Sequence, residues 1–404
     1  MSGRRPRITD AQRRYRLLRR HCLADSFRCE TVVDVADSMV GLHATTPSTV
    51  YLSTWARMSN GVFAPADMEA ALHSERTLIK QLAMRRTLFV FPESILRDAV
   101  GAIGSRVAAS ERTNLLRDLR RAEDFPDPEG WIEDARAAVR AEFADGHLLT
   151  SAELRSRIPE FDRHVIVSPE KSYGGPSPLI PRLMNLMSAA GEIVRGPNNG
   201  SWHVSRPSWS AMDRWLGHRL DVADPATAHA SLIRHWLERF GPGTETDIVW
   251  WLGSTKRDVR RALATLEVTE VDLDDGTVGY LLADDLPGGP DDEPLPPEAI
   301  LLPELDPTTM GHKARDFYLG PHADAIFDRN GNGGQTLWWD GRIVGGWYRD
   351  SPDHPVSVHL FEQLPAAARR AITARADELT EWLGDTHFRP GYPPPYRRAV
   401  TSSR

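Results

Sequence analysis

The stretch TETDIVWWLGSTKRDVRRALATLEVTEVDLDDGTVGYLLA, residues 244–283, gives the clearest indication of the fold. Thr244 can cap a first helix, and Ser254-Thr255 can cap a second helix that continues to the end of ALATL. Two strand-like runs follow, and the DDG at 274–276 between them is typical of a hairpin turn. Helix, turn, helix and hairpin in this order predict a winged helix.

An earlier part of the chain shows a similar order of elements. Its helix patterns are followed by two strand-like runs, Leu78–Met84 and Thr87–Phe91, which suggest a small hairpin. The helix patterns cover residues 9–24, 30–43, 48–58 and 65–73.

A third segment repeats the order once more. A short helix over 150–159 has Thr150 at its N-cap and Glu153 in the capping-box position. An amphipathic helix over 179–190 precedes GEIVRGPNNGSWHVS, which predicts two strands around the turn PNNG. Three copies in chain order argue for a tandem arrangement more strongly than any single copy does.

The C-terminal third begins with residues 284–298, a Pro-, Gly- and acid-rich stretch that predicts a loop or linker. Beyond it, TLWWDGRIVGGW predicts two strands joined at Asp340-Gly341. A last helix is expected over 362–384, and the proline-rich segment from 390 predicts a weakly ordered tail.

The charge is unevenly distributed along the chain. The net charge is −7, yet residues 1–20 carry eight arginines against Asp10 alone, while residues 284–298 carry six acidic residues and no basic one. An acidic linker can therefore hide basic faces from a whole-chain sum. The arginines have a second reading, because 45 arginines against four lysines also fit a GC-rich genome.

Several classes of protein are disfavoured by composition. No apolar run approaches the ~20 residues of a membrane helix, and the arginine-rich start lacks the apolar region of a signal peptide. Cys22 and Cys29 fit neither a disulfide framework nor a metal spacing, so a reducing cytoplasm is expected. HExxH and CxxC motifs are absent, and neither a metal nor another cofactor is expected.

Five stretches together resemble the winged-helix DNA glycosylase family of AlkZ- and YcaQ-like proteins. The family carries a motif like VGLQAQDPxxxYLxLWxR, and here VGLHATTPSTVYLSTWAR stands at residues 40–57. The order and spacing of the stretches match the family over nearly the whole chain. The other four are MRRTLFVF at 84–91, RFGPGTETDIVWWLG at 239–253, LLPELDPTTMGHKAR at 301–315 and LWWDGRIVGGW at 337–347.

The resemblance implies an α+β fold of three tandem winged-helix domains with a small C-terminal β-barrel. It also implies a monofunctional enzyme that hydrolyses the N-glycosidic bond of bulky alkylated purines or interstrand crosslinks, in base excision repair or in self-resistance to a genotoxin. Its partner would be duplex DNA carrying the adduct, and a monomer is expected. The expected domains are residues 1–100, 101–215 and 216–283 for the winged helices, 284–390 for the linker and barrel, and 391–404 for a flexible tail.

The family's catalytic pair, Gln-x-Gln or Gln-x-Asp, falls on His43 and Thr45, so this sequence departs from the family at both positions. A neutral imidazole can accept a proton from water, and a threonine hydroxyl can orient that water. His43 would then be the general base, with activity that falls below the pKa of an ordinary histidine, ~6.5. Asp306 in LLPELDP is either an acid that supports the site or a turn-forming residue before Pro307.

Candidate DNA contacts come from the predicted recognition helices, the predicted wings and the family motifs. They are Arg85, Arg86, Thr87, Arg182, Asn185, Asn198, Asn199, Lys256, Arg257 and Arg342.

Two alternatives remain open. The first is a non-catalytic winged-helix DNA-binding protein that has lost both glutamines. The second is a regulator that responds to a small molecule; such a regulator usually needs a dimerisation helix, and the sequence shows no heptad seam.

Overall fold

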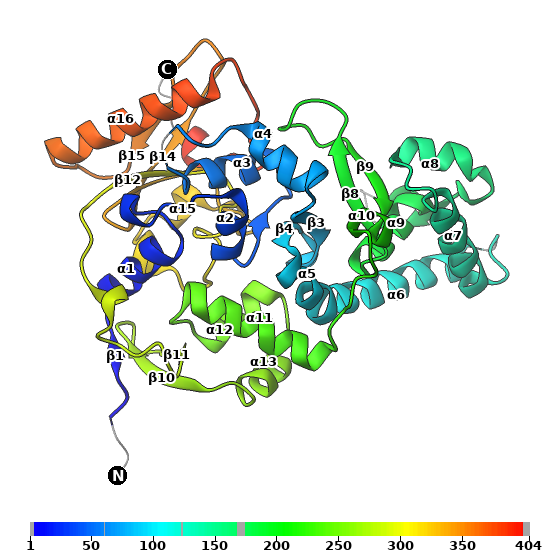
Figure 1. The fold of residues 1–404 in the computed structure, drawn as a ribbon, viewed down its shortest axis with the longest axis horizontal. Coiled ribbons are helices and arrows are strands. Elements are labelled where there is room, and N and C mark those ends of the chain that lie inside the picture. The colour runs from blue at the N-terminus through cyan, green and yellow to red at the C-terminus, as the bar shows by residue number, and fades with distance from the viewer. Residues whose placement is uncertain (1–3, 60, 123, 168–173, 399–404) are drawn as a thin grey trace. The chain divides into compact units, whose positions relative to one another are not determined.

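The chain divides into two compact units: unit 1, formed by residues 1–68 and 230–404, and unit 2, formed by residues 69–229. Both units mix helices with small sheets, which confirms the predicted α+β class (Figure 1). Among the described residues, no helix has the length and apolar composition needed to cross a membrane. The structure is a computed structural model that describes residues 4–59, 61–122, 124–167 and 174–398.

The helices and the hairpin predicted for residues 244–283 are all present in unit 1. Thr244 and Asp247 form a complete capping box at the start of α12, and Thr255 accepts a hydrogen bond from the backbone N–H of Asp258 at the start of α13. The elements are α12 (Glu245–Leu252), α13 (Lys256–Leu263), β10 (Val268–Leu273) and β11 (Val278–Leu282), and α11 (Pro225–Phe240) precedes them.

A strand from the N-terminus completes this small sheet. β1 (Arg7–Ile8) pairs in parallel with β10, so the strand order is β1-β10-β11. Ile8 is fully buried against Val271, Leu273 and Leu281, which form one apolar cluster with it. Residues 7 and 8 therefore pack with the segment predicted as the third winged helix.

The C-terminal strands form an open sheet, so the prediction of a small closed β-barrel is wrong for the described residues. Four antiparallel strands follow the order β12-β13-β14-β15, which leaves β12 and β15 as edges. The long helix α16 packs beside this sheet and contacts its edge strand β12 (Figure 1). In a closed barrel, β12 would instead pair with another strand. The elements are β12 (Ala299–Leu302), β13 (Thr336–Trp339), β14 (Arg342–Tyr348), β15 (Ser357–Leu360) and α16 (Ala366–Leu383).

Residues 391–398 differ from the flexible tail that their composition predicts. The hydroxyl of Tyr396 donates a hydrogen bond to the carbonyl oxygen of Trp347 at 2.8 Å and lies 3.3 Å from that of Gln335, and the ring is buried. Arg397 forms an ion pair with Asp350 at 2.6 Å. The buried ring of Tyr396 and its hydrogen bond thus hold this proline-rich segment in place. The segment has no helix or strand pattern from which its order could be predicted.

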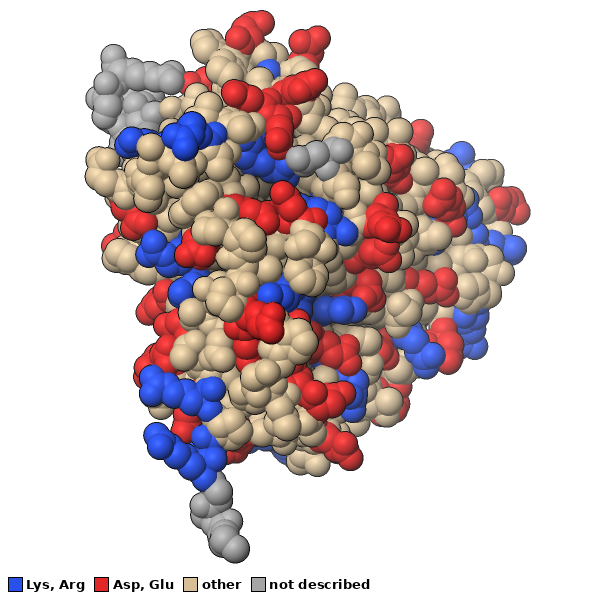
Figure 2. Space-filling model, turned by 60° about the vertical axis from the view of Figure 1, so that its left-hand side comes forward, with Lys and Arg blue, Asp and Glu red and all other residues tan. Residues whose placement is uncertain are grey.

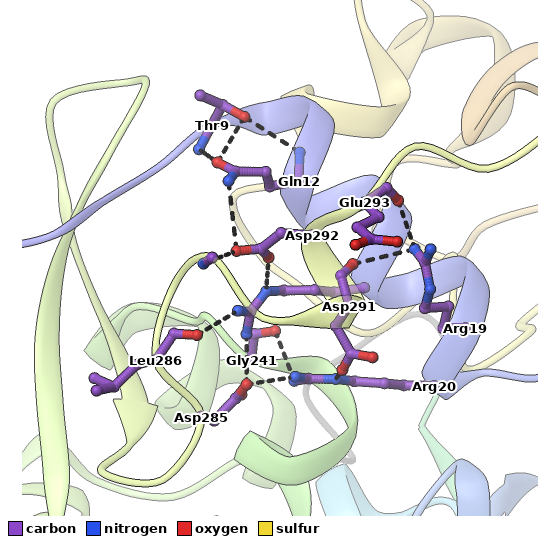
Figure 3. A network of polar contacts seen from close by, with 12 residues as sticks. Thr9, Gln12, Arg19, Arg20, Gly241, Asp285, Leu286, Asp291, Asp292 and Glu293 are labelled. Carbon is purple, nitrogen blue, oxygen red and sulfur yellow. Dashed lines mark hydrogen bonds and ion pairs between the residues drawn. The ribbon is translucent and has the colours of Figure 1, made fainter.

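The basic N-terminus and the acidic linker are bound to each other. Arg16 of α1 (Asp10–Arg20) is buried between Asp285 and Asp292, and Arg20 contacts Asp285 and Asp291 at 2.7 Å each (Figure 3). On the face drawn in Figure 2, basic and acidic side chains are interspersed. The arginines of α1 are therefore engaged within the protein, which removes the reason to assign this helix to DNA.

The remaining elements of unit 1 are short. They are α2 (Val32–Ser38), β2 (Leu42–His43), α3 (Pro47–Trp55), α4 (Pro65–Glu69), α14 (Asp316–Leu319), α15 (Ala323–Ile326) and the 3-10 turns Asp25–Phe27 and Pro290–Asp292.

Unit 2 contains several small sheets and one large apolar core. β3 pairs with β4 and β6 pairs with β7, while β8 and β9 form a sheet with β5 in the order β5-β9-β8. The core gathers leucine, isoleucine and aromatic side chains from α6, α7 and α9. The elements are β3 (Leu78–Leu82), β4 (Leu88–Pro92), α5 (Glu93–Ala99), α6 (Ser105–Arg121), α7 (Pro128–Glu142), β5 (Leu149–Thr150), α8 (Ser151–Arg157), β6 (His164–Val167), β7 (Gly175–Pro178), α9 (Leu179–Ala189), β8 (Ile193–Asn198), β9 (Pro207–Ala211) and α10 (Met212–Leu216). Short single turns lie at Ala70–Ser74, Met84–Arg86, Val100–Gly104 and Pro159–Phe161.

The loop that connects β8 and β9 is longer than the turn PNNG predicts. β8 ends at Asn198, and β9 begins only at Pro207, so residues 199–206 form a loop. The backbone N–H of Arg206 donates to the side-chain oxygen of Asn198 across the base of this loop. The predicted strand SWHVS is therefore wrong, because these residues close the loop and the strand begins after them.

Lys80 of β3 should make unit 2 less stable at neutral pH than an apolar residue would. Burial and, to a smaller extent, the nearby Arg195 lower its pKa from 10.5 to about 8. The charged form is therefore disfavoured in the folded state; this penalty is complete below pH 8 and disappears as the pH rises to 10.5. We expect Lys80→Met to raise the free energy of unfolding at pH 7 by up to about 3 kcal/mol.

Denaturant unfolding at several pH values measures this effect. The advantage of Lys80→Met over the natural protein should shrink between pH 8 and 10.5. A variant that is less stable than the natural protein at every pH would contradict this expectation.

Candidate active site and DNA contacts

His43 lies in a buried connection between two helices of unit 1. The chain leaves α2, passes through Val40 and enters the two-residue strand β2, which ends at His43. Only 3% of His43 is exposed, while Thr45 is half-buried. Thr46 follows as the N-cap residue of α3, with Pro47 at the first helical position. The two residues at the predicted catalytic positions are thus fixed between a strand and a helix start.

The segment Glu304–Thr308 binds along α3 and holds it in place. Thr49 donates a hydrogen bond to the carbonyl oxygen of Glu304 at 2.9 Å, and Ser53 donates to the carboxylate of Asp306 at 2.6 Å. One turn further, Arg57 forms a two-pronged ion pair with Asp306 at 2.8 and 2.9 Å. Residues 49, 53 and 57 are four apart, so their side chains lie on one face of α3 and its end.

Asp306 is a structural residue in this arrangement. Both Asp306 and Arg57 are completely buried, and Arg57 also donates to the hydroxyl of Thr308 at 2.8 Å. Asp306 additionally accepts the backbone N–H of Thr308 at 2.9 Å, a local turn typical of aspartate. The hydrogen bond to Thr308 fits the turn-forming interpretation, and the ion pair with Arg57 is a contact that the sequence does not indicate. The role of Asp306 in supporting the site stays a prediction.

Glu304 is a residue of the candidate site that the sequence analysis does not indicate. Its carboxylate accepts the backbone N–H groups of Gly391, at 2.9 Å, and Tyr392, at 2.5 Å, and contacts the hydroxyl of Thr46. Burial raises the pKa of this carboxyl group, and the three hydrogen bonds partly offset that rise. Glu304 therefore links the residue next to Thr45 with the C-terminal segment.

Two bulky residues adopt a left-handed backbone beside these groups. Val40 has a φ of 60° directly before GLHATTP, and Leu305 has a φ of 56° between Glu304 and Asp306. This region is rare for bulky or β-branched residues and costs on the order of 1–3 kcal/mol each. Such strain is concentrated at functional sites, and here it flanks both segments of the candidate site.

In unit 2, Arg85, Arg86 and Thr87 form the turn of the β3–β4 hairpin. Arg85 and Arg86 both have a positive φ, 53° and 59°, and Arg86 contacts Glu111 at 2.5 Å while remaining 60% exposed. The hydroxyl of Thr87 donates to the carbonyl oxygen of Met84. Arg86 is therefore placed on the surface, where it could exchange its carboxylate partner for a phosphate.

The other candidates of unit 2 differ in their surroundings. Arg182 forms an ion pair with Asp118 at 2.7 Å and is largely buried, so it contributes to the packing of α9 against α6. Asn185 and Asn199 line a common cavity, and Asn198 accepts a backbone hydrogen bond at the base of the loop.

In unit 1, Lys256 and Arg257 are exposed in the first turn of α13. Arg342, at the start of β14, is exposed and lies 3.4 Å from Glu362. Their position fits contact with a polyanion, and their role in DNA binding stays a prediction.

Comparison with known proteins bears on the site as a whole. A family model described as "DNA glycosylase AlkZ-like" matches residues 36–382. The chain belongs to the AlkZ-like DNA glycosylase family. The matched region contains His43, Thr45 and Glu304.

A solved AlkZ-like structure shows the same fold. Streptomyces sahachiroi DNA glycosylase AlkZ is 19% identical, with a TM-score of 0.69, and the similarity covers 93% of this chain and 97% of that one. Comparison with curated proteins gives no match. At this identity the likeness shows the fold, and the family model supplies the assignment.

Proposed function

We propose that this protein is a monofunctional DNA glycosylase that hydrolyses the N-glycosidic bond of bulky N7-alkylguanines or related alkylpurines, including interstrand crosslinks. Three tandem winged-helix modules would carry the DNA-binding surfaces, with α13 and α9 as recognition helices. Family membership supports the reaction class, and the bulky lesion is the part of the proposal that goes beyond it.

The observation that carries the proposal is the buried, strained setting of His43. An N7-alkylated guanine already carries a positive charge, so the enzyme must mainly stabilise an oxocarbenium-like sugar and position water. A neutral His43 could accept the proton of that water, while the hydroxyl of Thr45 could orient it. A protonated imidazole would repel the sugar cation, so the proposed role requires His43 in its neutral form.

Strand scission tests the proposal. The protein is incubated with a duplex that carries one bulky N7-alkylguanine, and the product is treated with alkali, which cleaves the strand at an abasic site. Scission that depends on the adduct supports a glycosylase. Tight binding with no scission across several adducts would support a non-catalytic DNA-binding protein, which the replacement of both family glutamines makes the main alternative.

Glu304→Gln should weaken the link between Thr46 and the C-terminal segment. An amide NH₂ in place of one carboxylate oxygen cannot accept the N–H of Gly391 or Tyr392 and leaves that donor unpaired. We expect a loss of about 1–3 kcal/mol in the free energy of unfolding near pH 4.5. Because the folded pKa of Glu304 is raised, the natural protein should lose part of this advantage as the pH rises above 4.5.

Glu298→Gln is a matched control, because the carboxylate of Glu298 also accepts a backbone N–H, that of Asp25, in unit 1. If Glu304 shapes the site, its variant should lose activity under conditions in which both variants are folded, and Glu298→Gln should not. Equal activities of the two variants would show that Glu304 does not shape the site.

A further inference from the structure

Unit 2 contains a cavity to which the base-release step assigns no role, although two of its lining residues, Asn185 and Asn199, are candidate DNA contacts. Its volume is about 510 Å³, and it lies between α8, α9 and the β8–β9 hairpin. Met184, Pro181 and Trp209 give it an apolar lining, while Asn185, Arg195 and Arg206 contribute polar groups. This size and composition are typical of sites that bind small organic molecules.

Arg195 is a desolvated cation on the wall of this cavity. Its guanidinium lies 4.8 Å from the centre of the Trp209 ring, and its Nε is buried without a hydrogen-bond partner. Within the part of the chain that the structure describes, Arg195 forms no ion pair. Burial lowers its pKa to about 10, so the group remains charged at neutral pH.

A second buried cation lies close by. β3 runs beside β8, and Lys80 of β3 is buried near enough to Arg195 for the two charges to repel each other. Glu69 is the acidic group that acts on Lys80 in this region, and it is partly engaged with His73 at 3.4 Å. Buried charges are normally paired, so this region has an excess of positive charge for its degree of burial.

Two other arginines of unit 2 that lie against a ring or in the interior are paired with carboxylates. Arg163 lies 4.2 Å from the centre of the Phe125 ring, and it also contacts Asp124 at 3.5 Å. Arg136 binds the carboxylate of Glu192 at 2.5 Å. Arg195 differs from both because the described residues provide no carboxylate for it.

We propose that this cavity binds a small aromatic anion. The ring of the ligand would pack on Trp209 and Met184, and its carboxylate or similar oxyanion would accept hydrogen bonds from the guanidinium of Arg195, with Arg206 at the rim. The apolar lining favours such a molecule over a backbone phosphate, which is usually held by exposed donors. The cavity lies beside α9, the proposed recognition helix of this unit, and it has no part in the base-release step itself.

Calorimetric titration with 2-naphthoate, and with 2-naphthamide as its neutral counterpart, tests the proposal. We expect the naphthoate to bind at least 10-fold more tightly than the amide to the full-length protein, and inorganic phosphate not to displace it. Equal affinities for the two compounds, no binding of naphthoate, or displacement by phosphate would overturn the proposal.

Two variants assign the binding to this cavity. Arg195→Met should weaken naphthoate binding at least 10-fold, and Arg163→Met, the matched arginine on a ring, should leave it unchanged. Arg206→Ala alters an exposed residue and should weaken binding even if Arg195→Met does not fold. Naphthoate affinity that is unaffected by Arg206→Ala and by a folded Arg195→Met would show that the probe binds elsewhere and would contradict the proposal.

Discussion

His43→Ala should lower the rate of base release by about 10²–10⁴-fold, the usual contribution of a general base. The imidazole lies in a rigid, buried connection directly before α3, where its loss removes the proposed proton acceptor for water. DNA affinity should change little, because binding depends on many charged donors far from this residue in the sequence. Single-turnover rates of alkali-sensitive strand scission, measured beside a binding titration, give both quantities.

Two further variants sharpen the test of His43. His218→Ala removes an exposed histidine of unit 2 and should leave the rate unchanged. His43→Gln combined with Thr45→Gln restores a pair found in the family and should retain measurable activity. A His43→Ala protein as active as the natural one would exclude a catalytic role for this residue.

Asp306→Ala should reduce the free energy of unfolding by about 3–5 kcal/mol, because it leaves the fully buried charge of Arg57 without its partner. The hydrogen bonds of Ser53 and Thr308 to the same carboxylate would be lost as well. Denaturant unfolding followed by circular dichroism measures the change.

Controls separate the buried ion pair from ordinary surface charge. Glu129→Ala removes a partner of Arg120 from an exposed ion pair and should cost no more than about 1 kcal/mol. Replacing both Asp306 and Arg57 by apolar residues should recover part of the lost stability. A stable Asp306→Ala protein that is inactive would instead assign Asp306 to catalysis.

The parts of the fold that the sequence predicts well are those with local signals. The caps at Thr244 and Thr255 start α12 and α13 as expected, and Asp340-Gly341 joins β13 and β14. The pairing of β1 with β10 joins residues more than 260 positions apart and leaves no periodic mark in the sequence. The open C-terminal sheet and the packed segment 391–398 also depend on long-range contacts, with α16 and Tyr396 respectively.

The candidate site was only partly predictable for a similar reason. The resemblance to a family motif indicates His43 and Thr45. No local pattern in LLPELDP marks Glu304 as a residue of the site. One local signal is present: Thr49, Ser53 and Arg57 form a polar row at four-residue spacing along α3 and its end. Such a row predicts a buried polar partner, and the structure supplies it in Glu304–Thr308.

The predicted DNA contacts show where charge alone is insufficient. Arg182, Arg16 and Arg20 bind carboxylates within the protein, whereas Lys256 and Arg257 remain exposed. A sequence cannot distinguish these cases when the acidic partner lies far along the chain, as Asp285 and Asp292 do from Arg16.

The central claim is that the protein releases a damaged base from DNA, and mass spectrometry of the released material tests it most directly. A duplex with a single bulky N7-alkylguanine is incubated with excess protein at neutral pH, and the small-molecule fraction is analysed. We expect the intact alkylated base, absent with undamaged duplex and strongly reduced with His43→Ala. Duplex that is bound by the natural protein but yields no free base above the spontaneous rate, for a range of bulky adducts, would contradict the claim.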